Sequence, residues 1–204
     1  MKEQQKKYEL TDEFIEHWSG KKLYRIRALV TFGAVVAGQL GGFVESEKNL
    51  DQSLSGDAWV YGNARVSGDA RVYGNAWVSG DARVYGNAWV SGDARVSGDA
   101  RVYGNAWVSG DAWVSGDAWV SGDARVRSYA VISDRKMIFW ASNVGSESGT
   151  LTVFNGKDGL IVTRGCFTGT VDEFLAKSAE VHDDKTKNEY KLLIEVAKSR
   201  ILGG

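Results

Sequence analysis

The sequence predicts a mainly β protein whose middle part is a parallel β-helix with a cap at each end. Residues 55–126 are twelve consecutive copies of the hexapeptide [Ser/Tyr]-Gly-[Asp/Asn]-Ala-[Arg/Trp]-Val, and residues 127–132 are a decayed thirteenth copy. The 204 residues include 25 glycines and no proline. Ala and Val stand two residues apart in every copy, so an extended backbone points both side chains to the same side.

Each hexapeptide is expected to supply one short strand and one corner. Ala and Val face inward, and the Arg or Trp between them faces outward. The Ser-Gly-Asp or Tyr-Gly-Asn triplet turns the chain, because Gly, Asp and Asn accept a positive φ. If each corner turns by about a third of a circle, three hexapeptides close a coil of eighteen residues, and coils stack about 4.8 Å apart. Proline is absent because it would remove a donor from the ladder between coils.

The repeat and the segment before it resemble known proteins. The run VYGNARVSGDARVYGNAWVSGDA at residues 60–82 is similar to the hexapeptide-repeat, left-handed β-helix superfamily. Residues 8–50, which contain YELTDEFIE, LYRIRAL and AGQLGGFVESEKNL, resemble a phage- and prophage-encoded subgroup of that superfamily. The resemblance implies a left-handed coil of three hexapeptides, a phage origin, and association of subunits through their side faces as trimers.

The chain is expected to divide into three parts. Residues 1–54 are an N-terminal cap with degenerate first coils, residues 55–132 are the β-helix, and residues 133–204 are an α+β module. Caps are needed because the ends of a stacked helix otherwise expose unpaired strand edges. Residues 8–32 are predicted to form a small antiparallel β element. The apolar residues expected to face the first coil are Leu23, Tyr24, Ile26 and Leu29. The Ala and Val register extends upstream at Ala28, Val30, Ala34, Val36 and Leu40.

The C-terminal module is predicted to contain strands around residues 137–142, 149–154 and 160–167, followed by two helices. Thr170 and Glu173 form a capping box ahead of the first helix. The apolar residues of that helix are Phe174, Leu175, Ala179 and Val181. The second helix follows Asp184, and its apolar stripe is Tyr190, Leu193, Ile194, Ala197 and Ile201. The helices are expected to cover the last coil, with dimerisation as the alternative.

The outward strand positions are expected to form three columns, because coils stack every eighteen residues. The members are Trp59, Trp77, Arg95 and Trp113 in the first column, Arg65, Arg83, Arg101 and Trp119 in the second, and Arg71, Trp89, Trp107 and Arg125 in the third. Stacking of such neighbours contributes about 0.5–1 kcal/mol per exposed pair, so a purely structural role would also account for them. At the corners, Tyr85 and Tyr103 are expected to stack.

Two binding hypotheses follow from these columns. In the first, a rigid Trp/Arg surface associates with further copies, as a dimer or trimer, or binds and inhibits a host protein. Its candidate residues are Trp59, Trp77, Trp89, Trp107, Trp113, Trp119, Arg65, Arg83, Arg95 and Arg101. In the second, the arginines of the second column hold a small anion such as phosphate or a nucleotide, provided that the Asp corners leave them without a counter-charge. Interleaved Trp would then stack on the base. Eight Asp against six Arg in residues 55–126 disfavour long nucleic acid.

Catalysis finds little support, and a non-enzymatic protein without cofactor or metal is expected. The related acyltransferases use a histidine base near the coils, but the perfect repeats contain no His, Cys or Lys. An acyltransferase is kept as the enzyme alternative. Cys166 and His182, with Asp183 as an orienting group, form a weak nucleophile pair, because a lone Cys after a strand is more often a small buried residue. Stacked aspartates such as Asp93 and Asp111 could share a cation, but Asp also suits a turn for local reasons.

Composition and charge indicate a cytoplasmic protein, in the host cytoplasm if it is phage-encoded. The net charge of −1 does not demand an anionic partner. The single cysteine excludes an intramolecular disulfide, which fits a reducing compartment. The N-terminus has no apolar core of signal-peptide length, and the longest apolar stretch, around residues 28–36, is too short to span a bilayer.

Overall fold

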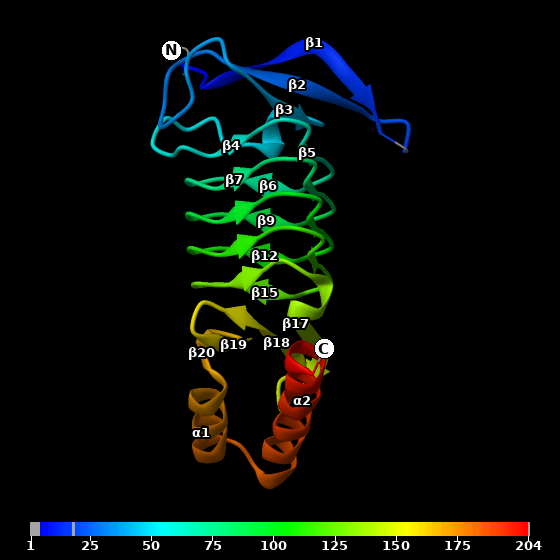
Figure 1. Ribbon diagram of the computed structural model, residues 1–204, viewed down its shortest axis with the longest axis vertical. Helices are drawn as coiled ribbons and strands as arrows, with labels where there is room; N and C mark the ends of the chain where they lie inside the picture. The colour runs from blue at the N-terminus through cyan, green and yellow to red at the C-terminus, as the bar shows by residue number, and fades with distance from the viewer. Residues whose placement is uncertain (1–4, 18, 204) are drawn as a thin grey trace.

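The computed structural model describes residues 5–17 and 19–203, and a parallel β solenoid of about five coils forms the middle of the elongated molecule (Figure 1). Residues 1–4, residue 204 and Trp18 lie outside the described residues, and with them part of the charged N-terminus and one aromatic residue of the predicted cap. The repeat strands line up in three sheets. Each strand pairs in parallel with the strand eighteen residues along the chain, as Arg65 does with Arg83.

Each repeat strand is two residues long. The first sheet contains β4 (Trp59–Val60), β7 (Trp77–Val78), β10 (Arg95–Val96), β13 (Trp113–Val114) and β16 (Val131–Ile132). The second contains β5 (Arg65–Val66), β8 (Arg83–Val84), β11 (Arg101–Val102) and β14 (Trp119–Val120). The third contains β6 (Arg71–Val72), β9 (Trp89–Val90), β12 (Trp107–Val108) and β15 (Arg125–Val126). The prediction of a mainly β solenoid repeat is therefore confirmed.

The interior of the solenoid is filled by the Ala and Val side chains of the repeat, and each of them is at most 1 % exposed. Burying one valine side chain contributes about 1.5–3 kcal/mol, so the repeated burial is the main force that holds the coils together. The corners depend on glycine. Gly86 has a φ of 71°, and a Cβ at this position would lie 3.1 Å from the backbone nitrogen of Gly104 in the next coil. Both the backbone conformation and the close stacking therefore require glycine.

The N-terminal cap closes one end of the solenoid. It consists of the antiparallel strands β1 (Tyr8–Glu16) and β2 (Lys22–Ala28), the strand β3 (Leu40–Val44) and the 3-10 helix η1 (Glu47–Asn49). Strand β3 continues the second solenoid sheet, and the N–H of Phe43 donates to the carbonyl of Ala64. The side-chain amide of Asn49 donates to the carbonyls of Gly68 and Ala70 at 3.0 and 2.9 Å. The cap thus satisfies carbonyls that would otherwise form an open edge.

A buried lysine, Lys7, closes the edge of the first solenoid sheet at the same end. The ammonium group of Lys7 donates to the carbonyls of Gly56 and Ala58 at 3.1 and 3.2 Å. Burial lowers the pKa of Lys7, while Asp51 and Asp57 act in the opposite direction. The two carbonyl partners compensate for part of the cost of burying the charge.

The predicted cap is correct in its antiparallel strands and wrong in its extension of the repeat register. Leu23 and Ile26 are buried as expected, but Leu29 is exposed. The upstream positions Ala34, Val36 and Leu40 are exposed as well. Hydrogen bonds join Ala28 to Gln39 and Gly38 to Ala28, so residues 29–37 form a loop that returns to its own start. The loop does not form a coil, and it contributes Phe32 and Val35 to the core instead of the residues in the repeat register.

A four-stranded antiparallel sheet closes the other end of the solenoid. Its strands are β17 (Ile138–Val144), β18 (Gly149–Gly156), β19 (Gly159–Arg164) and β20 (Phe167–Thr170). One face places Ile138 and Phe154 in the same core as the repeat. Thr152 accepts a hydrogen bond from the N–H of Arg125, and Thr163 donates to the carbonyl of Arg125. The sheet therefore caps the last coil.

Both predicted helices are present, α1 (Val171–Val181) and α2 (Asp184–Leu202), and the Thr170–Glu173 capping box forms. They pack on the face of the C-terminal sheet that points away from the solenoid (Figure 1). The expectation that the helices cover the last coil is wrong, because the sheet lies between them and the repeat. On α1, Ala179 and Val181 are exposed while Ser178 is buried, so the buried face is narrower than predicted.

Candidate anion-binding cleft

The strand register places the outward side chains in three columns along the solenoid, with the members expected from the sequence. Column A is defined as Trp59, Trp77, Arg95 and Trp113. Column B is Arg65, Arg83, Arg101 and Trp119. Column C is Arg71, Trp89, Trp107 and Arg125. Every candidate residue taken from the repeat lies in one of these columns, but their environments differ.

Trp59 is not available to a partner, which corrects its place among the interface candidates. Its side chain is 0 % exposed. The ring centroids of Phe32 and Tyr8 lie 5.4 and 6.0 Å from that of Trp59, both in edge-on arrangements. The first coil has no preceding repeat to cover it, so the N-terminal cap folds over this indole. Trp59 is a core residue of the cap.

Column C places two adjacent indoles between two cations, an arrangement that stabilises the coil stack. The ring of Trp89 meets the ring of Trp107 edge-on at 5.7 Å. The guanidinium carbon of Arg71 lies 5.7 Å from the ring centroid of Trp89, and that of Arg125 lies 5.9 Å from that of Trp107. Cation–π contacts of this kind contribute about 0.5–1 kcal/mol each at exposed sites. The arginines of column C are therefore already engaged with aromatic neighbours.

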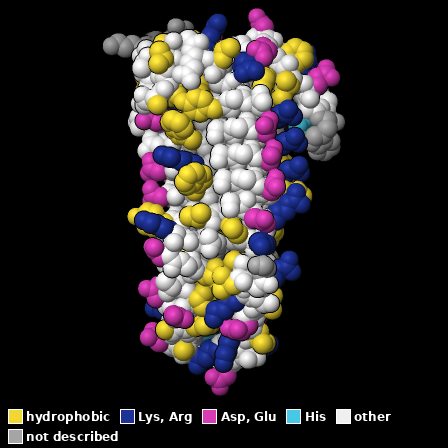
Figure 2. Space-filling view, viewed as in Figure 1, with side chains coloured by type: hydrophobic (Ala, Val, Ile, Leu, Met, Phe, Trp, Pro, Cys, Tyr) yellow, Lys and Arg dark blue, Asp and Glu magenta, His cyan; other side chains and the backbone are white. Residues whose placement is uncertain are grey.

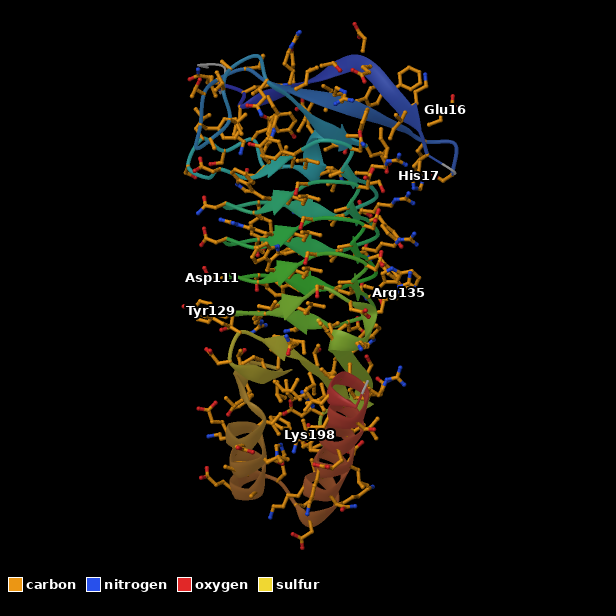
Figure 3. The ribbon with its side chains drawn as sticks, in the orientation of Figure 1. Glu16, His17, Asp111, Tyr129, Arg135 and Lys198 are labelled. Carbon is orange, nitrogen blue, oxygen red and sulfur yellow. The ribbon has the colours of Figure 1, made fainter. Side chains whose placement is uncertain are left out.

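Column B lines a concave site of about 300 Å³. Column C also lines a concave site, of about 330 Å³, but among the described residues it has Arg71 as its one arginine, beside Lys48, Asp51 and Trp89. The cleft is lined by Arg65, Arg83 and Arg101 together with three groups from outside the column: His17, Ser67 and Tyr85. Ser67 and Tyr85 come from the corners that follow β5 and β8, and His17 comes from the turn between β1 and β2. Figure 3 shows His17 at the tip of this hairpin, beside the first coils. All six of the described residues that line the column B cleft can donate hydrogen bonds, and none of them is a carboxylate.

The three arginines of column B form no ion pair within the described part of the chain, although aspartates lie at neighbouring corners. No ion pair in residues 5–17 and 19–203 involves Arg65, Arg83 or Arg101. Acidic side chains run in a row beside basic side chains along the repeat (Figure 2). The Cα atoms of arginines on neighbouring strands lie about 5 Å apart, so their like-charged guanidinium groups repel one another. Among the described residues the guanidinium groups of this row are therefore not neutralised by direct ion pairs, which favours anion binding.

Glu45 attaches the hairpin that carries His17 to the first coil of the solenoid, at Gly68. The Glu45 carboxylate accepts hydrogen bonds from the ammonium group of Lys21 at 2.8 Å and from the backbone N–H of Gly68 at 2.7 Å. Partial burial alone would raise the pKa of Glu45, but the hydrogen bonds from Lys21 and Gly68 outweigh it and lower the pKa. The hydrogen bond to Glu45 raises the pKa of Lys21. Glu45 is thus a charged anchor, already occupied, that holds one rim of the cleft.

Aromatic side chains lie beside the arginine row, and they contact another ring or a guanidinium group. Tyr85 and Tyr103 stack as predicted, with centroids 5.0 Å apart and an interplanar angle of 2°. The indole of Trp119 is contacted by the guanidinium of Arg101 at 5.1 Å and by that of Arg135 at 3.8 Å. Figure 3 shows Arg135 on the same side of the molecule as His17, near the other end of the repeat. His17 and Arg135 lie outside the perfect repeats, and no sequence pattern predicts that His17 lines the cleft or that Arg135 contacts Trp119.

The second chemical candidate, Cys166 and His182, is assembled only in part. Both residues line one concave site of about 240 Å³ with Tyr190. Cys166 is exposed, contrary to the expectation of a buried residue. The imidazole of His182 packs edge-on against Tyr190 and lies 3.2 Å from the hydroxyl of Ser178. Asp183 accepts a hydrogen bond from the N–H of Thr186 as the N-cap of α2, and within the described residues no hydrogen bond joins it to His182.

Other corner residues show no metal-binding geometry. Among the described residues there is no group of three or more His, Cys, Asp or Glu side chains that could hold a metal ion. Some corners instead form a ladder of amides and carboxylates. Asn87 donates to Asn105, which donates to Asp123, at 3.1 and 2.9 Å. These bonds give the corners a structural role.

The comparisons with known proteins characterise the repeat. The family model described as the YdcK beta solenoid repeat matches residues 58–74, 64–80, 76–92, 82–98, 94–110 and 100–116. Together with the three parallel sheets, this match shows a β-solenoid repeat protein. No curated protein matches the chain significantly. Among the described residues, no helix is both long and apolar enough to cross a membrane.

Proposed function

We propose that the protein is a non-enzymatic binding protein that captures a small phosphate-bearing anion in the column B cleft. The observation that carries this proposal is the row of Arg65, Arg83 and Arg101, which lines a concave site without a carboxylate partner in the described chain. Guanidinium groups bind phosphate through paired N–H donors, and such charge-assisted hydrogen bonds are about twice as strong as neutral ones.

The surroundings of the row favour a small ligand over a long polyanion. Asp81, Asp99 and Asp117 occupy the corners that precede the strands of column B, and all three are exposed. A long nucleic acid crossing the solenoid would meet these carboxylates, whereas an anion inside the cleft meets only donors. An anion between the guanidinium groups also removes their mutual repulsion.

Calorimetric titration with inorganic pyrophosphate tests the proposal. We expect Arg83→Gln to weaken binding by about tenfold or more, because it removes a charge-assisted contact of about 1.5–3 kcal/mol at the centre of the row. The matched control is Arg95→Gln, an exposed column A arginine that lies outside the cleft. Circular dichroism checks that both variants are folded. Wild-type protein that binds no phosphate anion, or equal losses in the two variants, would remove the proposal.

A second candidate function, association through the tryptophan surface, is favoured by the exposure of two indoles. Trp113 is 52 % exposed and Trp89 is 39 % exposed, and exposed aromatic residues are common at interfaces. The occupant would be a further copy of the chain, in a dimer or trimer, or a host protein. Trp77 and Trp107 are half-buried and would contribute less.

The finer structural and biological assignments also belong to this proposal. A left-handed coil of three hexapeptides is supported by the eighteen-residue pairing offset and by the resemblance to hexapeptide-repeat proteins. A phage origin and a place in the host cytoplasm rest on the resemblance of residues 8–50. Acyl transfer remains the enzyme alternative.

A further inference from the structure

We infer that the column B cleft recognises its ligand by a linear oligophosphate chain and makes no stacking contact with a base. This inference rests on the proposed anion binding and specifies the class of ligand. It departs from the sequence-based hypothesis that a tryptophan beside the arginines would stack on a nucleobase.

The first argument is the spacing of the charges. Arg65, Arg83 and Arg101 occupy equivalent positions on three neighbouring parallel strands, so their Cα atoms are separated by the strand spacing of about 4.8 Å along the solenoid axis. If the three side chains extend outward in parallel, the two outer guanidinium groups lie about 10 Å apart, which is too far for both to bond one phosphate. A chain of phosphoryl groups laid along the axis can offer oxygens to all three, and each arginine keeps a planar set of five N–H donors for them.

The second argument is that the aromatic rings near the row already have partners. Tyr85, the only phenol that lines the cleft, stacks face to face on Tyr103. Trp119 is contacted by Arg101 and Arg135. At the other end of the row Phe43 pairs with Arg65, and the guanidinium of Arg25 lies 4.4 Å from its ring centroid. A base would have to displace one of these contacts before it could stack.

The third argument is that the row is limited at both ends. Beyond Arg65 the column continues with Phe43, and beyond Arg101 it continues with Trp119. The guanidinium carbon of Arg101 lies 5.1 Å from the ring centroid of Trp119, and a cation–π contact uses none of the N–H donors of the arginine as hydrogen bonds. Three arginines between two aromatic residues favour about three phosphoryl groups, and a longer chain would extend past the donors.

The test is a calorimetric series in EDTA, so that divalent cations do not compete for the phosphates. The probes are inorganic phosphate, pyrophosphate, tripolyphosphate, AMP, ATP and GTP. We expect affinity to rise by roughly tenfold with each added phosphate up to three, since each adds a charge-assisted contact. ATP and GTP should bind within about threefold of each other, and AMP should bind no better than inorganic phosphate. Tripolyphosphate separates recognition of the bare chain from recognition of the nucleoside.

Two variants complete the design. Arg83→Gln should reduce the tripolyphosphate affinity to about that of inorganic phosphate, because it interrupts the row at its centre, and Arg95→Gln should leave the affinity unchanged. Equal binding of phosphate and tripolyphosphate, or a tenfold preference between ATP and GTP, would overturn the inference while leaving anion binding intact. If no probe binds, the proposed function itself fails.

Discussion

The Glu45 carboxylate and the Lys21 ammonium group lie 2.8 Å apart, and this ion pair holds the tip of the N-terminal hairpin beside the first coil. The second oxygen of the same carboxylate accepts the N–H of Gly68. This contact positions the turn that carries His17 at the cleft. The charge on Glu45 therefore affects both the stability of the cap and the shape of the candidate site.

The anchor makes cap stability depend on pH. The folded-state pKa of Glu45 lies below its ordinary value, so its contribution is present above the pKa of the unfolded chain and is lost as the pH falls through the lowered folded value. We expect Glu45→Gln to lower the melting temperature near pH 7 by about 2–4 °C. In thermal unfolding followed by circular dichroism, the difference from wild type should vanish in acid. A difference that persists at low pH would contradict the charged anchor.

Glu47→Gln is the control for that experiment. Glu47 forms an exposed ion pair with Lys6 at 2.7 Å and takes no backbone N–H through its carboxylate. Exposed pairs contribute about 0–1 kcal/mol, so this variant should melt close to wild type at all pH values.

The buried lysine of the cap gives a second prediction. Lys7→Met leaves the carbonyls of Gly56 and Ala58 without their donor, and each lost partner costs about 1–3 kcal/mol. Removal of a buried charge offsets part of this cost, so we expect a net loss of about 1–3 kcal/mol in chemical denaturation. Lys6→Met, at the neighbouring exposed position, should change the unfolding midpoint little. Equal midpoints for both variants would show that Lys7 does not close the solenoid edge.

The corner glycines give a third prediction, which separates backbone conformation from stacking. Gly86 and Gly165 both have positive φ, 71° and 59°. A Cβ on Gly86 would approach Gly104 to 3.1 Å, whereas a Cβ on Gly165 would meet nothing within 4 Å. Gly165→Ala should cost about 1–2 kcal/mol for the left-handed conformation alone. Gly86→Ala should cost more, and equal unfolding free energies would argue against tight coil stacking.

The exposed indoles give a fourth prediction. If columns A and C hold copies together, Trp113→Ser combined with Trp89→Ser should reduce the mass measured by light scattering to that of one 22.2 kDa chain. Tyr129→Ser is the control, because this ring is also exposed but stands outside the three columns. A wild-type protein of single-chain mass, or a double variant of unchanged mass above it, would exclude this interface.

The repeat could be predicted because its physical signal is local and redundant. The alternation of Ala and Val around one outward residue fixes which side chains are buried, and the period fixes which of them become neighbours. Trp77, Arg95 and Trp113 therefore share a column that can be listed from the sequence alone. The capping box at Thr170 and the buried face of α2 are local signals of the same kind.

The caps and the cleft could not be predicted, because they depend on contacts between segments without a common period. Trp59 occupies the same position of the hexapeptide as Trp77, and the fold of residues 5–50 over the first coil buries it. His17 reaches column B through a hairpin whose anchor, Glu45 to Gly68, joins residues 23 positions apart. Leu29 was expected inside because it continues an apolar pattern, but its segment closes into a loop.

The two ends of the solenoid are closed by unlike elements, a lysine and an amide at one end and a sheet with threonine hydroxyls at the other. Between them each coil contacts only its neighbours. Duplication of residues 79–96 would therefore insert one more coil without changing either closure, and it would give column B a fourth arginine. Each such duplication would lengthen this charged row by one coil spacing. The number of coils would then set the length of the ligand that the row can bind.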